Sequence, residues 1–470
     1  PGFDAFRAYP ISSITNTLTV TINNNSSSIN MADVIHPLLR YQTGRDVREY
    51  EYSTSPHMQD QYQRYEAGVL TNRNALAGYN DTFYEVPRGA FPYTSLVNPP
   101  LQDGVATNAV VTADLTEQIF LSPLLFGKYE KSGFIGVQTM DFNFTFISNL
   151  ARIWSHANID GRTINSITVD LGQPRLLFTY ITPKQDMVIP RSIVYPFYDV
   201  QRYPTDANAA IAAGASTTLS SANIQLQSIP RRMYILARKR NADLYNGVAA
   251  ANQTDTYFRI DNISINWNNN SGLLSSASSE DLYRISTKNG CNLSWEQWSG
   301  GPLFNVSGGI PARVGAVGSV LAIDFGEDIG LDSLECPGML GTYQLQYTVT
   351  VTNVNQVEAI TPTLYTIVIS EGSFTIMENR SIAQVGVVSR EDVLRSKEDP
   401  KVPFSAIEDA QYGGNFYSGL KRIGSDILHG IEKAGPAVKS IAEVAEKVAP
   451  IVAPLVLAGL RKDEKVVVVV

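Results

Sequence analysis

The side chains that most often perform acid–base or metal chemistry are few and scattered in this sequence. There are four histidines, His36, His57, His156 and His429, and no two of them are close in sequence. None has metal-ligand spacing such as HExxH, and none has a partner cysteine. Each histidine is therefore interpreted as a surface or core residue, and the sequence predicts neither a metal site nor a cofactor.

Two pairs of neighbouring carboxylates are candidates for acid–base chemistry. Glu280-Asp281 or Glu327-Asp328 would have to act as the acid and base of a glycoside hydrolase. The first pair is better explained as the first turn of a helix, because Ser278 and Asp281 have the spacing of a capping box. The second pair follows a predicted strand. The sequence also has no Walker loop and no nucleophile elbow, so the chain is predicted not to be an enzyme.

The tryptophans indicate a different possible function, the binding of carbohydrate. Trp267 alternates with Ile263 and Ile265, so we expect it in a core. Trp295 and Trp298 lie in a predicted loop, where a contact with another subunit and a contact with a sugar remain alternatives. The second alternative would make the chain a β-sandwich carbohydrate-binding protein or adhesin.

The elements that carry these residues are predicted to be strands with one buried face. Apolar side chains alternate with polar ones in Met140–Phe146 and in 343–351, the clearest examples. The same period of two recurs at 18–22, 167–171, 176–181, 263–267 and 364–369. The strands form two sets, at 14–197 and 217–377, joined by the small-residue stretch 206–216. The pattern predicts an all-β, antiparallel protein.

Composition limits the function further. The 470 residues are enough for two or three domains, and the charged fraction of 17% is below the ~25% typical of soluble domains. Such a chain is expected to bury surface against copies of itself. The net charge is −8 and no Lys/Arg-rich arm is visible, so we expect no strong direct binding of nucleic acid. Cys291 and Cys336 lack a CxxC motif and predict a reducing compartment.

The spacing of apolar residues changes after the second set of strands. Residues 389–415 are charged, contain proline and are predicted to be a linker, and 416–470 follow helical spacing and are predicted to be an amphipathic tail. The tail either anchors the subunit to a neighbour or acts on a membrane, through the apolar stretch 448–460. Its apolar face consists of Leu420, Ile423, Ile427, Ile431, Val438, Ile441, Val448, Val452 and Leu455.

Several segments resemble the major capsid proteins of the double jelly-roll lineage of double-stranded DNA viruses. The closest likeness is to the polinton, adintovirus and adomavirus branch, with adenovirus hexons and virophage coat proteins as more distant relatives. The segments lie at 118–146 (with IFLSPLLFGKY), 228–239 (SIPRRMYILARK), 263–286, 318–331 (GSVLAIDFGEDIGL) and 337–351 (PGMLGTYQLQYTVTV).

The resemblance implies two tandem eight-stranded jelly rolls. The first would span 1–200 with an outward loop at 53–113, and the second 201–388 with a loop at 268–317. It implies homotrimers of pseudo-hexagonal outline in an icosahedral virion shell, in contact with neighbouring capsomers, penton and minor capsid proteins. Assembly would take place in the host cytoplasm or nucleus, with an internal or host membrane as a further partner of the tail. The family has no catalytic residues to transfer to this chain.

Overall fold

The computed structural model describes residues 4–7, 9–41, 93–97, 110–124, 134–156, 165–178, 180, 192–247, 255–300, 302–307, 310–315, 318–332, 335–355, 358–377 and 380–386. Within these residues the named strands pair antiparallel, as the alternation predicts. The predicted linker 389–415 and tail 416–470, and most of the loop 53–113, lie outside the described residues.

A three-stranded sheet, here called the N-terminal sheet, has the order β3-β2-β6. Residues 18–22 and 140–146 form its strands as predicted, and two helices pack beside it. The elements of this part are β1 (Asp4–Phe6), α1 (Pro10–Ile14), β2 (Thr15–Ile22), β3 (Asn25–Ile29), α2 (Met31–Leu39), β4 (Tyr93–Val97), β5 (Val110–Ala113), β6 (Met140–Phe146), the short 3-10 helix η4 (Leu150–Ile153) and β7 (Trp154–His156). β1 pairs with β7, and β4 pairs with β5.

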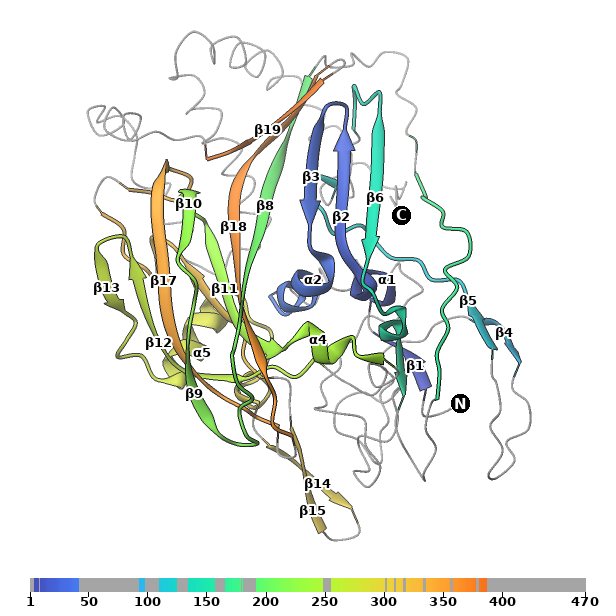
Figure 1. Cartoon of the computed structure of the whole chain (residues 1–470). Coiled ribbons are helices and arrows are strands. Elements are labelled where there is room, and N and C mark those ends of the chain that lie inside the picture. Colours follow the sequence, from blue (N-terminus) through green and yellow to red (C-terminus); the bar gives the residue numbers. More distant parts are fainter. Residues whose placement is uncertain are drawn as a thin grey trace, which may run out of the picture.

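Ten of the remaining strands form two sheets that face each other, and β14 pairs with β15 separately. The outer sheet has the order β10-β17-β12-β13, and β9 also pairs with β17; the central sheet has the order β16-β11-β18-β19, and β8 also pairs with β18. In Figure 1 the central sheet lies between the outer sheet on the left and the N-terminal sheet on the right. Their strands are β8 (Ser192–Asp206), β9 (Ser216–Ser220), β10 (Ile224–Ser228), β11 (Arg232–Lys239), β12 (Arg259–Trp267), β13 (Asn270–Leu273), β16 (Leu321–Asp324), β17 (Leu340–Thr352), β18 (Pro362–Met377) and β19 (Arg380–Val385).

Two hydrophobic cores lie on opposite faces of the central sheet. Met233 and Ile235 of β11 belong to the core shared with the outer sheet. Tyr234 and Leu236, which alternate with them, belong to the core shared with the N-terminal sheet, where Val20 of β2 is buried. Each buried side chain of this size stabilises the fold by about 1.5–3 kcal/mol. Because both faces of β11 are covered, its sequence is almost continuously apolar.

Two expectations about the strands were wrong. Strands were predicted at 167–171 and 176–181, and the structure describes these residues as far as 178. The segment 165–178 is extended but forms no strand, because no described strand pairs with it. The stretch 206–216 does not join the two halves. It connects β8 to β9, and both strands belong to the second set, since β8 pairs along its length with β18.

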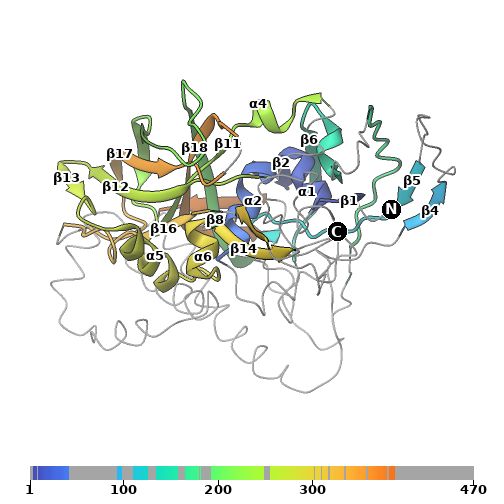
Figure 2. The same ribbon diagram turned by 90° about the horizontal axis from the view of Figure 1, so that it is seen from below.

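The segment 268–317, predicted as one long loop, contains regular elements. They are β13, α5 (Ser279–Lys288), α6 (Trp295–Ser299), β14 (Pro302–Ser307) and β15 (Ile310–Gly315). The helix predicted from Ser278 and Asp281 is confirmed, because both reciprocal hydrogen bonds of the capping box form. Seen from below in Figure 2, α5 and α6 lie side by side along one edge of the second set of strands. A further short helix, α4 (Asn241–Leu244), follows β11.

Candidate functional site at the junction of the two halves

The two described histidines lie within secondary-structure elements. His36 is buried in α2, and its Nε2 lies 2.8 Å from the hydroxyl of Ser13. Burial lowers the pKa of His36 to about 4, so the ring is neutral at physiological pH. His156 ends β7, and His57 and His429 lie outside the described residues. Within the described ranges, no group of three or more His, Cys, Asp or Glu side chains is placed to hold a metal ion.

The two carboxylate pairs considered for a hydrolase serve local structure. Asp281 accepts hydrogen bonds from the backbone and hydroxyl of Ser278 at the start of α5, which lowers the pKa of the Asp281 carboxyl. Glu327 and Asp328 both pair with Lys288 of the same helix, at 3.2 and 3.3 Å. Asp281 therefore caps α5, and Glu327 and Asp328 bind its C-terminal end through Lys288.

The two tryptophans that were predicted to lie in a loop belong to the helix α6, and they differ in environment. The expectation that Trp298 contacts a sugar or another subunit was wrong: its side chain is 0% exposed, and its indole N–H donates to the carbonyl of Val320 at 3.0 Å. Trp295 is partly buried and stacks on Trp298 with ring centroids 6.0 Å apart. Trp267 is buried, as predicted from its alternation. Within the described residues, no helix is both long and apolar enough to cross a membrane. The tail face from Leu420 to Leu455 lies outside the described residues.

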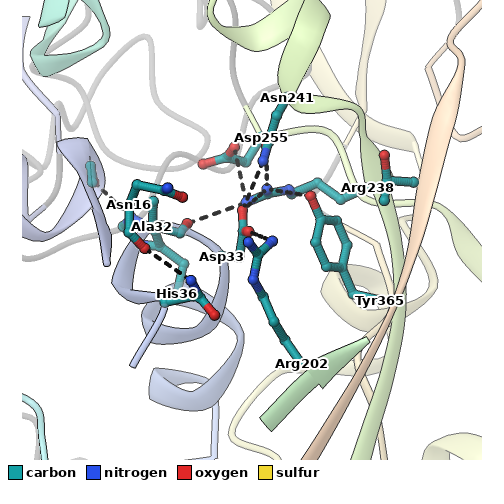
Figure 3. Close-up of polar contacts among 12 residues, drawn as sticks. Asn16, Ala32, Asp33, His36, Arg202, Arg238, Asn241, Asp255 and Tyr365 are labelled. Atoms are coloured by element: carbon teal, nitrogen blue, oxygen red, sulfur yellow. Dashed lines mark hydrogen bonds and ion pairs between the residues drawn. The ribbon is translucent and has the colours of Figure 1, made fainter. Parts of the chain in front are cut away.

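The densest group of buried charges lies where α2 meets the central sheet (Figure 3). Asp33 of α2 accepts a hydrogen bond from Nη2 of Arg238 at 2.7 Å and pairs with Arg202 of β8. Nδ2 of Asn241 also donates to Asp33, at 3.1 Å. Asp33 is thereby held by residues of β8, of β11 and of the helix that follows β11. The charges join the N-terminal half to the second half.

Arg238 also links this group to a second carboxylate. Its Nη1 lies 3.8 Å from Asp255, and Arg152 donates to Asp255 at 2.7 Å. Burial alone would raise the pKa of Asp255, but Arg152 and Arg238 bring it below its ordinary value. The carboxylate is therefore ionised, and the cluster is a set of mutually compensating charges. Desolvating such charges is costly, so removing one partner is far more destabilising than the pair is stabilising.

The C-terminal end of α2 is fixed to the second half as well. The guanidinium of Arg40 lies 3.9 Å from the ring centre of Tyr257, and its Nη1 donates to the carbonyl of Gly318 at 3.0 Å. The hydroxyl of Tyr41 donates to the carbonyl of Val320. These contacts and the Asp33 group hold α2 at both ends, so the two halves have one defined orientation.

Sequence reasoning did not select Asp33 or Arg238. A signal was present for Arg238, since a charged residue within the apolar run MYILA-R-K must find a partner if the strand is buried on both faces. Asp33 stands in the equally apolar helix MADVIHPLL. Which carboxylate meets which arginine depends on the packing of α2 against β11, and the sequence pattern does not contain that information.

Comparison with known proteins identifies a family with this two-half arrangement. Residues 2–189 match the model of the Sputnik virophage major capsid protein first domain, and residues 200–372 match that of the major capsid protein V20 C-terminal domain. The chain is 36% identical over 431 residues to the capsid protein V20 of Sputnik virophage, covering 90% of this chain and 71% of the relative. The chain belongs to the virophage major capsid protein family. Within the lineage proposed from sequence, these matches fall on the virophage branch.

Two solved capsid structures agree with this chain in fold. The Sputnik virophage cryo-EM structure has a chain 34% identical, with a TM-score of 0.71 over 88% of this chain and 82% of that chain. The mavirus major capsid protein, at 14% identity, has a TM-score of 0.63 over 84% of this chain and 81% of that chain. The fold is thus the double jelly roll expected from the sequence. The chain is a structural component of a virion shell, not an enzyme, and the carbohydrate-binding alternative is not favoured.

Proposed function

We propose that three copies of this virophage-family capsid protein form a trimer of pseudo-hexagonal outline that tiles an icosahedral shell. The observation that supports this is the fixed pairing of two β-rich halves in one chain through a shared central sheet. Three such chains present six similar blocks, and six blocks approximate the symmetry of a hexagonal lattice. Neighbouring capsomers, penton and minor capsid proteins are the further partners of this proposal.

We divide the chain into a first roll at 1–200, a second roll at 201–388, a linker at 389–415 and a tail at 416–470. The two family matches, which end at 189 and begin at 200, support the position of the boundary. β8 (Ser192–Asp206) spans this boundary and pairs along its length with β18, so its residues before 201 lie in the proposed first roll but pair with a strand of the second. The loops 53–113 and 268–317 are proposed to face outward from the shell.

The tail is proposed to anchor the subunit to its neighbours or to act on an internal or host membrane. The helical spacing of its apolar face from Leu420 to Leu455 supports both roles. Genome packaging is proposed to proceed without strong direct binding by this chain, since the net charge is −8. Assembly of the shell is proposed to occur in the host cytoplasm or nucleus.

Light scattering on the purified chain, with electron microscopy of the same sample, tests the trimer. We expect a mass about three times 51.5 kDa and particles of hexagonal outline. A chain that stays monomeric across the accessible concentrations would contradict the proposal.

A further inference from the structure

The outer sheet has a solvent-facing surface with an unusual composition. Its accessible positions carry uncharged hydrogen-bonding side chains, among them Thr218, Gln225, Ser264, Gln344, Gln346 and Thr348. The charged side chains on the described part of this surface are Arg259 and Asp261, which pair with each other at 2.6 Å at one end of β12. Most of the surface therefore offers amides and hydroxyls without a net charge.

The helix beside this sheet has the composition of a solvated surface. α5 exposes Glu280, Arg284 and Lys288, side chains that are rarely buried. Charged residues are depleted at the centres of protein interfaces, because their desolvation is costly. The contrast between α5 and the outer sheet therefore marks the outer sheet as a surface that becomes covered.

The arrangement of the two halves indicates what covers it. The central sheet of the second half is already covered by the N-terminal half of the same chain. In a ring of six similar sandwiches each block meets two neighbours, so the second half must meet another block on its opposite side. The outer sheet lies on that opposite side in both views (Figures 1 and 2).

The other end of the molecule carries an exposed apolar surface. Residues 165–178 and Tyr180, here called the apolar segment, run beyond β6 as the green trace at the right of Figure 1. The ring of Phe178 lies 6.1 Å from that of Phe142 in β6. Large apolar side chains of this segment are exposed, with 45% of Leu177, 46% of Phe178 and 90% of Tyr180 accessible. Contiguous exposure of this kind is typical of a protein interaction site.

We propose that the outer sheet of one copy packs against the apolar segment of the next copy around the trimer. The inference rests on the proposed trimer and assigns the surfaces that build it. The contact joins two different surfaces, so it repeats head to tail and closes after three copies. The backbone of the apolar segment belongs to no sheet of the described residues, so glutamine and threonine side chains of the outer sheet can hydrogen-bond to it.

Charge introduced at the centre of either surface tests the assignment. Gln346→Glu on the outer sheet and Leu177→Glu in the apolar segment would each bury an unpaired carboxylate in the contact. We expect each to raise the concentration at the midpoint of trimer dissociation at least about tenfold, measured by analytical ultracentrifugation. Thr287→Glu, at an exposed position of α5, is the matched control and should leave the midpoint unchanged.

The outcomes separate this inference from the trimer itself. A monomeric wild type would overturn both. A trimeric wild type with unchanged midpoints for Gln346→Glu and Leu177→Glu would overturn the assignment of surfaces and leave the trimer standing. Circular dichroism and thermal melting of each variant show whether a loss of trimer comes from a loss of fold.

A photo-cross-linker at Gln225, near the edge of the outer sheet, gives an independent measurement. Benzoylphenylalanine placed there in the assembled full-length chain should form inter-chain cross-links, and mass spectrometry should map them to residues 165–180. Inter-chain cross-links to a different region of the partner, or none at all in a trimeric sample, would refute the proposed contact.

Discussion

Arg238 and Asp33 pair at 2.7 Å across the junction of the two halves, and each side chain is 2% exposed. Arg238 belongs to β11 and Asp33 to α2, so their pairing requires the N-terminal half to be seated on the central sheet. Arg202 completes the group at Asp33 from β8. The orientation that sets the shape of the capsid building block is thus specified by a few buried charges within a large apolar contact.

Asp33→Ala should destabilise the fold strongly. It removes the carboxylate that accepts a hydrogen bond from the buried Arg238 and pairs with Arg202, and breaking a buried pair from one side costs about 3–5 kcal/mol. Denaturant titration of the free energy of unfolding measures the effect. Arg284→Ala is the control, since it removes an exposed ion pair with Asp281, and exposed pairs contribute little to stability. Similar losses for the two variants would contradict the role given to Asp33.

The stability of the chain should depend on pH through His36. Burial lowers its pKa from 6.5 to about 4, so the unfolded chain binds a proton where the folded chain does not. This contribution is fully present above about pH 6.5 and is lost as the pH falls toward about 4, by up to about 3 kcal/mol. His36→Gln should therefore flatten the decrease in unfolding free energy over this range, as measured by denaturant titration.

Glu117 should make the unfolding free energy depend on pH in the direction opposite to His36. Its carboxylate accepts hydrogen bonds from the backbone N–H groups of Ile11 and Ser12 at 2.7 and 2.9 Å, yet burial raises its pKa from 4.5 to about 7. The folded chain then binds the extra proton, so this contribution declines as the pH rises from about 4.5 to 7. Glu117→Gln should remove that decline. Identical pH profiles for wild type, His36→Gln and Glu117→Gln would exclude both assignments.

Trp298 and Trp295 should respond differently to truncation. Trp298→Ala leaves a cavity under α6 and removes one of the two side-chain hydrogen bonds to the carbonyl of Val320, and should cost about 3–5 kcal/mol. Trp295→Ala removes a partly buried ring and should cost clearly less. Thermal melting followed by circular dichroism compares the two directly. A larger loss for Trp295→Ala would mean that α6 packs the other way round.

Deleting residues 416–470 should leave the trimer intact and alter shell assembly or membrane interaction. The prediction follows from the change to helical spacing in this stretch, which is separated from the strands by the proposed linker. Light scattering reports the trimer, and co-sedimentation with anionic vesicles reports membrane binding. Reduced vesicle binding with normal assembly would favour the membrane role, and the reverse would favour anchoring. Loss of the soluble trimer on deletion would contradict the prediction.

Strand alternation was a reliable guide wherever one face of a strand is buried. β6, β12 and β17 follow the period of two closely, and the capping residues Ser278 and Asp281 located α5. The same pattern failed at 167–171, because alternation reports an amphipathic segment and does not supply the neighbouring strand that pairs with it. The Asp33 group was missed for a similar reason: its members are as much as 208 residues apart, from Asp33 to Asn241, and meet through tertiary packing.

The contact between the β2–β3 turn and β19 limits how far the chain can fold during its synthesis. The hydroxyl of Ser381 donates to the carbonyl of Ile22, and its N–H donates to Asn24 at 2.8 Å, across almost the whole described chain. The end of β2 and the β2–β3 turn can therefore form these bonds only after β19 has been synthesised. A chain terminated before residue 362 would lack β18 and β19, and with them part of the central sheet on which its N-terminal half packs. Synthesis through β19, though not through the tail, is thus built into the fold as a condition for joining the shell.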